Sequence, residues 1–386
     1  MKRLNYAGLV LIIALAACDT TKTKSQDQDI LPEKLKSIVE YNDSCMSEGL
    51  WTGAVVLAGT PTETVFRQAW GFTSEDKTIE MPEDGIFDMA SVTKPVATIT
   101  SMAICMDSGW VDINAPFTQY LPEYRGELQG TVKVFDLARH ISGFDNSKPY
   151  LQYRGAEMIQ NLLTNSPVRP PKQRFEYACI NYILLGLIVE EVSGEPLDKF
   201  CKENIFVPLS MQDTRFTPVP KTGRVVKSPF TPEQGVASDN PARFAGRPIG
   251  NAGLFSTADD LANYCRMILG KGKYGDKRIL SEEAVQAMSI RPDTCSPLAF
   301  GWFVNRINTP PSLSKATLTH SGWAGNTIWI DPDQQCFVIV LTNRSGGHGE
   351  AMVARGELAE LVLMAMHEEL GLTDYDNVSE DIKGKN

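Results

Sequence analysis

The chain has 386 residues, a formal net charge of −10 and a hydrophobic content of 42%. This length is enough for one large domain or two ordinary ones, and the composition is that of a globular protein with a sizeable core. The acidic balance, with no long basic run, argues against binding of nucleic acid through its phosphates.

The amino-terminal segment has the features of an export signal. Two basic residues precede an apolar run over residues 7–17, which is too short to span a bilayer. The run leads into Leu15-Ala16-Ala17-Cys18, which resembles the bacterial lipobox, whose cysteine is lipidated. Residues 1–17 are therefore predicted to be a signal peptide and residues 18–32 a lipidated polar tether. The prediction is an exported lipoprotein, lipidated at Cys18 and anchored in a membrane, that faces the periplasm or the cell exterior.

Hydrophobic periodicity predicts secondary structure along the rest of the chain. The spacing over 31–49 is that of an amphipathic helix, and residues 53–58 and 64–70 form a predicted hairpin. A helix is predicted from Ser91 to about Ser108, closed by Gly109. The later predicted elements are helices over 134–140, 156–163, 182–192 and 259–269, strands over 299–307, 318–321, 327–330 and 336–342, and a helix over 350–370.

These elements predict an α/β (α+β) fold. A mostly antiparallel sheet, built from both ends of the chain and flanked by helices, carries an inserted all-helical domain. The predicted boundaries are a domain over 33–373, with its sheet part at 33–88 and 297–373 and its helical insert at 89–296, followed by a polar tail over 374–386.

The tetrad Ser91-Val92-Thr93-Lys94 is the first candidate for chemistry. On a helix, positions i and i+3 share a face, so the amine of Lys94 can reach the hydroxyl of Ser91 and help to activate it. If Ser91 begins the helix, its backbone N–H and the helix dipole meet the charge that develops on an attacked carbonyl. The spacing alone is also that of a capping serine followed by a solvated lysine.

Further motifs follow the tetrad in order, and together they carry a resemblance. The chain resembles the serine β-lactamase and penicillin-binding-protein superfamily, in its class C and esterase-like branch, over roughly residues 33–370. The stretches that match are Ser91-Val92-Thr93-Lys94, Leu137-Ala138-Arg139-His140-Ile141-Ser142-Gly143, Phe175-Glu176-Tyr177-Ala178-Cys179 with Asn181-Tyr182, residues 206–214, residues 252–261, and His320-Ser321-Gly322.

The resemblance implies a β-lactamase/transpeptidase-like fold and a role for each catalytic residue. Ser91 would be the acylated nucleophile, and Lys94 would help to remove its proton, with a pKa lowered by burial. Tyr177 would be the second proton carrier, its phenolate favoured by the nearby lysine. The backbone N–H groups of Ser91 and Trp323 would form the oxyanion hole, which requires an edge strand beside the start of the helix.

The resemblance also implies substrate-binding residues, and two of them depart from the family pattern. His320-Ser321-Gly322, followed by Trp323, stands where many relatives carry Lys-Thr-Gly, whose lysine holds the substrate carboxylate. Histidine is mostly neutral at pH 7, so its hold on a carboxylate is weaker. Gly322 lets the substrate backbone lie against the strand. Cys179 stands where Asn or Asp is usual, and a thiol is a poor hydrogen-bond partner.

The sequence thus predicts a serine hydrolase that acts on amide or ester carbonyls through an acyl-enzyme on Ser91. Three substrates remain open: a cell-wall D-alanyl peptide, a β-lactam, and a small ester, the last favoured by His320 with Trp323 and Trp329. The alternative is a penicillin-binding protein or sensor that is acylated with little turnover, which Cys179 favours. The four histidines lack metal-ligand spacing and no phosphate-binding loop occurs, so no cofactor is expected. The oligomeric state stays open.

Overall fold

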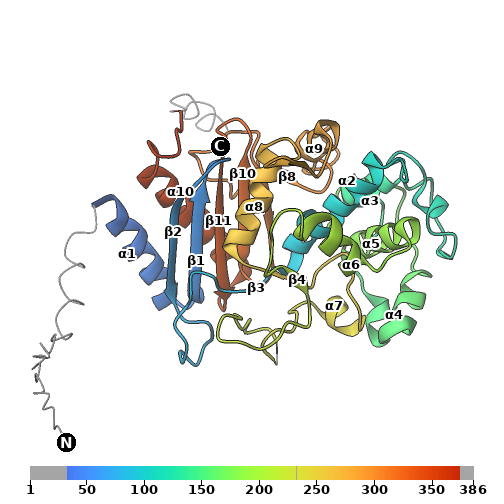
Figure 1. Cartoon of the computed structure of the whole chain (residues 1–386). Helices are drawn as coiled ribbons and strands as arrows, with labels where there is room; N and C mark the ends of the chain where they lie inside the picture. The colour runs from blue at the N-terminus through green and yellow to red at the C-terminus, as the bar shows by residue number, and fades with distance from the viewer. Residues whose placement is uncertain (1–32, 232, 374–386) are drawn as a thin grey trace, which may run out of the picture.

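The structure is a computed structural model, and it describes residues 33–231 and 233–373 (Figure 1). Outside the described residues lie the predicted signal peptide (1–17), the tether (18–32) with Cys18, and the polar tail (374–386). None of the helices in the two described ranges is long and apolar enough to cross a membrane.

Six antiparallel strands form the main sheet, in the order β2-β1-β11-β10-β9-β8. The first two strands of the chain supply one side of this sheet and the last four supply the other. Their bounds are β1 (Trp51–Gly59), β2 (Thr64–Gly71), β8 (Phe303–Val304), β9 (Leu318–Ser321), β10 (Asn326–Asp331) and β11 (Cys336–Arg344). This arrangement confirms the predicted antiparallel sheet built from both ends of the chain.

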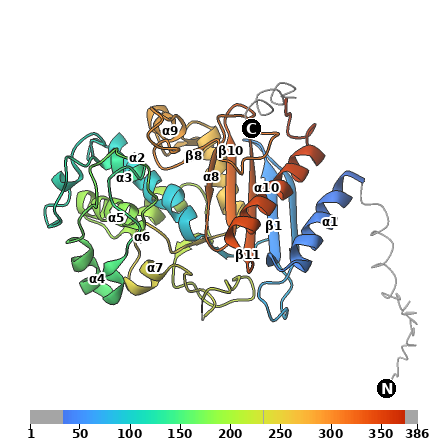
Figure 2. The same ribbon diagram turned by 180° about the vertical axis from the view of Figure 1, so that it is seen from behind.

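Helices cover both faces of the main sheet (Figure 2). On one face, α1 (Glu33–Ser47) and α10 (His348–Ala365) pack side by side, and on the other face lies α8 (Ala258–Leu269). Successive side chains of a strand point to opposite faces, and this divides the core in two. The cross-strand partners Val56 and Val340 pack with α1 and α10, whereas their neighbours along each strand belong to the cluster that contains α8.

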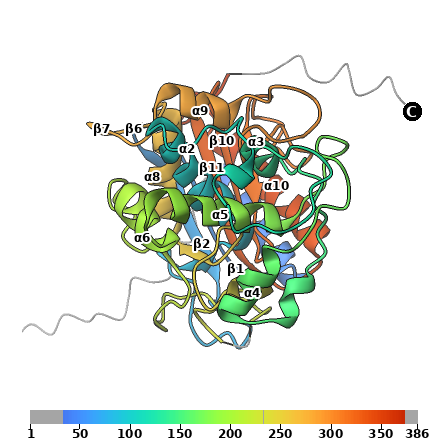
Figure 3. The same cartoon turned by 90° about the vertical axis from the view of Figure 1, so that its right-hand side faces the viewer.

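The middle of the chain forms a helical region beside the sheet (Figure 3). Its central helix is α5 (Cys179–Ser193), which contains the helix predicted over 182–192 and is mostly buried. The other helices are α2 (Thr100–Asp107), α3 (Val134–Ala138), α4 (Gly155–Leu162), α6 (Leu197–Cys201), the π-helical segment η5 (Lys202–Phe206), α7 (Asn240–Phe244) and α9 (Glu282–Ser289), and a small hairpin joins β6 (Lys273–Tyr274) to β7 (Lys277–Arg278).

A second, three-stranded sheet connects the helical region to the main sheet. It consists of β3 (Phe87–Asp88), β5 (Leu254–Ser256) and β4 (Arg215–Phe216), in the order β3-β5-β4. Strands this short carry no detectable periodicity, and the sequence did not predict them. The N–H of Met89 donates to the carbonyl of Leu254 at 2.8 Å. This sheet therefore fixes the chain just before Ser91.

Two predicted elements differ from the structure. The strand predicted over 299–307 is reduced to β8, because Gly301 adopts a φ of 88° and Asn305 a φ of 51°, which end an extended strand on either side. The helix predicted from Ser91 is a succession of a 3₁₀ turn η1 (Ala90–Val92), a π-helical segment η2 (Lys94–Ile99) and α2. Its end agrees with the prediction, since Gly109 follows with a φ of 71°.

Candidate active site

Ser91 lies partly exposed in η1, in a turn held by a buried carboxylate. The residue before it, Ala90, has a φ of 44°, which is unusual for a residue with a side chain. Asp88 holds this conformation: its Oδ1 accepts from the N–H of Ala90 at 3.0 Å and its Oδ2 accepts from the N–H of Ser238 at 2.6 Å. Its carbonyl accepts from Asn326 Nδ2 at 2.6 Å. We call residues 88–92 the nucleophile turn, after the role predicted for Ser91. This turn is thereby tied to both sheets and to the helical region.

Lys94 is fully buried and reaches Ser91, as its i, i+3 spacing predicts. Its Nζ donates to Ser91 Oγ at 3.0 Å and to the carbonyl of Asn251 at 2.7 Å. The predicted lowering of its pKa is wrong. Burial does act to lower the pKa of Lys94, but the combined attraction and hydrogen bonding of Tyr177, Cys179 and the more distant acidic groups raise it above its usual value. Lys94 is therefore a charged ammonium in the resting site.

Tyr177 lies beside Lys94, with its ring centroid 5.0 Å from Nζ. The ring is positioned by His140, whose own ring centroid is 4.3 Å away and whose Nδ1 accepts from the N–H of Ala178 at 3.1 Å. The structure thus brings together Ser91, Lys94 and Tyr177. Their catalytic roles remain predictions, but a hydroxyl, a buried ammonium and a phenol in one site can activate a serine for attack on a carbonyl.

Cys179 is the first residue of α5 and lies next to Lys94. Its side chain is buried, with 7% of the residue exposed, and it is one of the groups that raise the pKa of Lys94. Its backbone N–H donates to Asn146 Oδ1 at 3.4 Å. Within the described ranges its thiol makes no hydrogen bond, whereas an amide at this position has two donors and an acceptor to offer. The site is therefore less constrained here than the family pattern implies.

The end of β9 passes directly beside the nucleophile turn. A Cβ on Gly322 would lie 2.4 Å from the carbonyl oxygen of Met89, so only glycine allows this approach. The short β8 pairs with Leu318 and Thr319 and stops there. Among the described residues, no strand therefore pairs with the chain from Ser321 onward on that side. This geometry supplies the free strand edge that the predicted oxyanion hole requires.

His320 is buried at 1% exposure and faces two cations. Burial, with Lys94 and Arg306 nearby, lowers its pKa well below the usual value, so the imidazole is neutral. Its Nδ1 lies 3.1 Å from the carbonyl oxygen of Ser321. The Ser321 hydroxyl accepts from Thr327 Oγ1 at 3.2 Å. His320 therefore brings no charge to the site.

The sequence missed two positive charges, one near His320 and one beside Trp323. Arg306, in the loop after β8, is partly exposed, interacts with Tyr177 and His320, and has no carboxylate partner among residues 33–231 and 233–373. Arg344, at the end of β11, donates from Nε to the carbonyl of Trp323 at 2.7 Å, and its guanidinium lies 4.5 Å from the centroid of that ring. Arginines in loops and at strand ends carry no periodic signal that would have revealed them.

The two tryptophans that favoured an ester substrate lie in different places. Trp323 is 52% exposed beside the nucleophile turn, where it stacks on His348 at 4.6 Å between ring centroids. Trp329 is fully buried in the core beneath α1 and α10, so it does not line the site. The reason is the alternation of β10, which points Trp329 to the face of the sheet that these helices cover.

Comparison with known proteins agrees with this fold. The chain matches the Beta-lactamase family over residues 42–363. It belongs to that family and is a serine hydrolase. No group of three or more His, Cys, Asp or Glu side chains that could hold a metal ion occurs in the part of the chain that the structure describes.

Individual relatives are distant in sequence. One curated relative, "Putative D-alanyl-D-alanine carboxypeptidase" of Escherichia coli K12, is 27% identical over 329 residues, which cover 73% of this chain and 76% of the relative. Among solved structures, EstCE1, "a hydrolase with promiscuous acyltransferase activity", superposes with a TM-score of 0.71 at 20% identity and covers 85% of this chain and 98% of its own. A penicillin-binding protein homologue from Caulobacter crescentus has a TM-score of 0.68 at 18% identity, covering 87% and 98%. These structures share the fold.

Gly322→Ala is expected to impair the site. The added methyl group would meet the carbonyl of Met89 and push the end of β9 away from Ser91, and a displacement of this kind lowers reactivity on the order of 100-fold. The measurement is the rate at which a fluorescent fluorophosphonate labels Ser91. Gly349→Ala, where a Cβ meets nothing within 4 Å, is the matched control and should label at the wild-type rate. Equal rates for both variants would contradict the close approach.

The stability of the folded protein is expected to fall in mild acid. Burial, with Arg344, Arg355 and Arg306 nearby, lowers the pKa of His348 from 6.5 to about 4. In mild acid the unfolded chain therefore binds more protons at this histidine than the folded protein does. The contribution of the neutral His348 to the free energy of unfolding is fully present above about pH 6.5 and is lost as the pH falls towards 4. When the pH is lowered from 7 to 4.5, the free energy of unfolding should fall by roughly 1 kcal/mol less in His348→Gln than in the wild type, after allowance for the partial exposure of the side chain. Urea denaturation at both pH values measures this, and identical losses would contradict it.

Proposed function

We propose that this protein is an acyl-enzyme hydrolase that removes the terminal residue of a D-alanyl peptide outside the cytoplasmic membrane. The observation that carries the proposal is the buried Lys94 ammonium, 3.0 Å from Ser91 Oγ and beside Tyr177. The export features of residues 1–17 and the lipobox-like Cys18 support the location. The names of the curated relatives, D-alanyl-D-alanine carboxypeptidases, support the substrate.

In the proposed reaction Ser91 Oγ attacks the carbonyl carbon while its proton passes to Tyr177 as phenolate. Lys94 stays charged and stabilises the negative charge of both groups, because its raised pKa makes it a poor proton acceptor. The N–H groups of Ser91 and Trp323 bind the oxyanion. Collapse of the intermediate breaks the amide bond, and the leaving amine takes the proton from Tyr177. Water then attacks the acyl group by the same steps and regenerates Ser91.

Ser91→Ala is the direct test of this reaction. It should abolish both hydrolysis of an acylated D-Ala-D-Ala peptide and covalent labelling by a fluorescent penicillin or fluorophosphonate. Another serine provides the control: Ser289→Ala, which removes a hydroxyl that donates to the carbonyl of Val285 at 2.7 Å at the end of α9, should still be labelled. Undiminished labelling of Ser91→Ala would show that another residue is acylated.

The positive charge around Trp323 favours a substrate that carries a carboxylate. Arg306, Arg344, Arg355 and His348 lie close enough to affect one another, and their mutual repulsion adds to burial in lowering the pKa of Arg355 to about 9. No carboxylate of the described chain pairs with any of the three arginines. Of these arginines Arg306 is partly exposed, whereas Arg344 and Arg355 are buried, and uncompensated cations next to a site attract anions. A D-alanyl peptide ends in a carboxylate, whereas a simple ester does not.

Arg306→Gln tests this preference. It should raise KM for the D-Ala-D-Ala peptide about tenfold, because a charge-assisted contact to the carboxylate is lost. KM for neutral p-nitrophenyl acetate should stay within about twofold, since that ester has no carboxylate. Arg306→Lys keeps the charge and should recover part of the peptide affinity. Equal changes for the peptide and the ester would remove the basis for a carboxylate-bearing substrate.

A second candidate function is a penicillin-binding protein or sensor that is acylated with little turnover. Cys179 favours it, because the thiol provides no hydrogen bond to orient Lys94 or the substrate. The mass of the protein, followed over time after addition of a penicillin, separates the two: a persistent adduct means a binding protein, and a transient one means a hydrolase.

Cys179→Asn restores the side chain usual in the family and should speed loss of the acyl group about tenfold or more, if the missing amide limits deacylation. The same mass measurement reports the result. Cys201→Ala, at a buried thiol in α6, is the control for the loss of a cysteine and should leave the rate unchanged. An unchanged rate in Cys179→Asn would remove the argument for slow turnover.

A further inference from the structure

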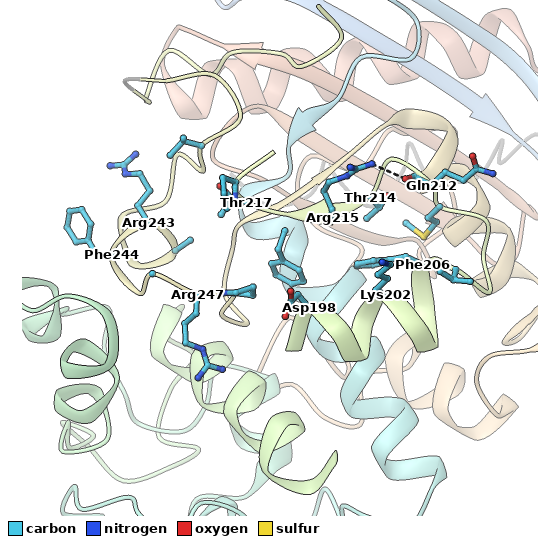
Figure 4. Close-up of a pocket in the computed structure, with 18 of the residues that line it drawn as sticks. Asp198, Lys202, Phe206, Gln212, Thr214, Arg215, Thr217, Arg243, Phe244 and Arg247 are labelled. Carbon is cyan, nitrogen blue, oxygen red and sulfur yellow. Dashed lines mark hydrogen bonds between the residues drawn. The ribbon is translucent and has the colours of Figure 1, made fainter. Parts of the chain in front are cut away.

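A cavity of about 1190 Å³ opens between α6, η5, β4 and the segment that contains α7 (Figure 4). This volume is enough for a small organic molecule. Ser91, Lys94 and Tyr177 do not line it, so it is separate from the candidate active site. In Figure 4, Arg243 and Phe244 lie at one side, and Lys202 projects from the helix that forms the floor.

The charge of this cavity is opposite to that of the whole chain. Its lining contains one acidic side chain, Asp198, and five basic ones: Arg154, Lys202, Arg215, Arg243 and Arg247. Arg247 is neutralised by an ion pair with Glu190, and the nearest carboxylate to Arg215 is 4.0 Å away. Arg154, Lys202 and Arg243 have no carboxylate partner within residues 33–231 and 233–373. In a protein with a net charge of −10, such a local surplus of cations attracts an anion.

The cavity also has an apolar component next to these cations. The guanidinium of Arg154 lies 3.5 Å from the centroid of the Phe244 ring, and that of Arg243 lies 6.0 Å from the same centroid. Phe206 and Phe216 add aromatic surface to the lining. Arg154 is held in place by hydrogen bonds to two backbone carbonyls, at 2.7 and 2.8 Å. Its orientation is therefore set before any ligand arrives.

We propose that this cavity is a second ligand site, which binds an anionic small molecule that carries an aromatic or other apolar group. The anion would interact with Arg154 and Lys202, and the apolar group would lie on the phenylalanine rings. The site is independent of acylation at Ser91, because none of its residues belongs to the proposed reaction.

One wall of the cavity is connected to the candidate active site, and this decides which residues can be changed in a test. Asp239 Oδ1 accepts from the N–H of Ala242, at the start of α7, and from Asn251 Nδ2, both at 3.0 Å. Arg243 donates to the carbonyl of Ser238 at 3.3 Å. A change at Arg243 would therefore disturb the segment that holds Lys94. Arg154 packs on the Phe244 ring of this segment, but within residues 33–231 and 233–373 neither Arg154 nor Lys202 has a hydrogen bond to the segment's polar groups.

The test is a fluorescence titration of the full chain with two probes of nearly the same skeleton. One is 8-anilinonaphthalene-1-sulfonate, which is anionic, and the other is N-phenyl-1-naphthylamine, which lacks the sulfonate. The anionic probe should bind at least about tenfold more tightly than the neutral one. The double variant Arg154→Gln/Lys202→Gln should weaken the anionic probe about tenfold and leave the neutral probe unchanged within about twofold.

Two controls locate the probe. Arg278→Gln removes an exposed arginine outside the cavity that, like Arg154, donates to two backbone carbonyls and that also pairs with Glu282 at 3.8 Å, and it should not change binding. Prior labelling of Ser91 by a neutral alkyl fluorophosphonate, with the excess reagent removed, should also leave binding unchanged. Equal affinity for the two probes, wild-type affinity in the double variant, or loss of anionic-probe binding after this labelling would each overturn the proposal.

Discussion

The burial of one ammonium group is the constraint on which the site depends. Removing a charged lysine from water costs several kcal/mol unless hydrogen bonds and opposite charges compensate for it. Lys94 has these partners: Ser91 Oγ, the carbonyl of Asn251, and the phenol of Tyr177. Each comes from a different segment of the chain. The segments that carry Ser91, Asn251 and Tyr177 must therefore meet for the ammonium to be stable, and their meeting is what makes a reactive site.

The motif that contains His140 and Ser142 serves to hold these partners in place. His140, with a φ of 55°, accepts from the N–H of Ala178 and lies 3.0 Å from Asn181 Nδ2. Ser142 donates to the same asparagine at 2.6 Å. The turn after α3 and the start of α5 are thus locked together, and the orientation of Tyr177 follows from this lock. A buried polar network with these partners is rigid, which suits the proton transfer proposed for Tyr177.

His320 stands where many relatives carry the lysine of Lys-Thr-Gly, and in this chain the positive charge lies on other residues near the site. His320 is neutral because Lys94 and Arg306 oppose its protonation in a buried position. The charge lies instead on the partly exposed Arg306 and on the buried Arg344, which contacts Trp323. The proposed attraction of an anionic substrate therefore depends on the loop after β8 and on the end of β11, two regions that do not belong to the His320-Ser321-Gly322 motif.

The sequence by itself determined the order of the main elements, the antiparallel sheet from both ends, and the contact of Lys94 with Ser91, because each follows from periodicity or from spacing within one helical turn. It did not determine the strands β3, β4 and β5, which are too short to show a period, or the loss of most of the strand predicted over 299–307. Only the tertiary structure placed Asn251 and Arg306 at the site and Trp329 in the core. The raised pKa of Lys94 was also decided there, since it is a sum of burial and of charges that the fold brings together from distant parts of the chain.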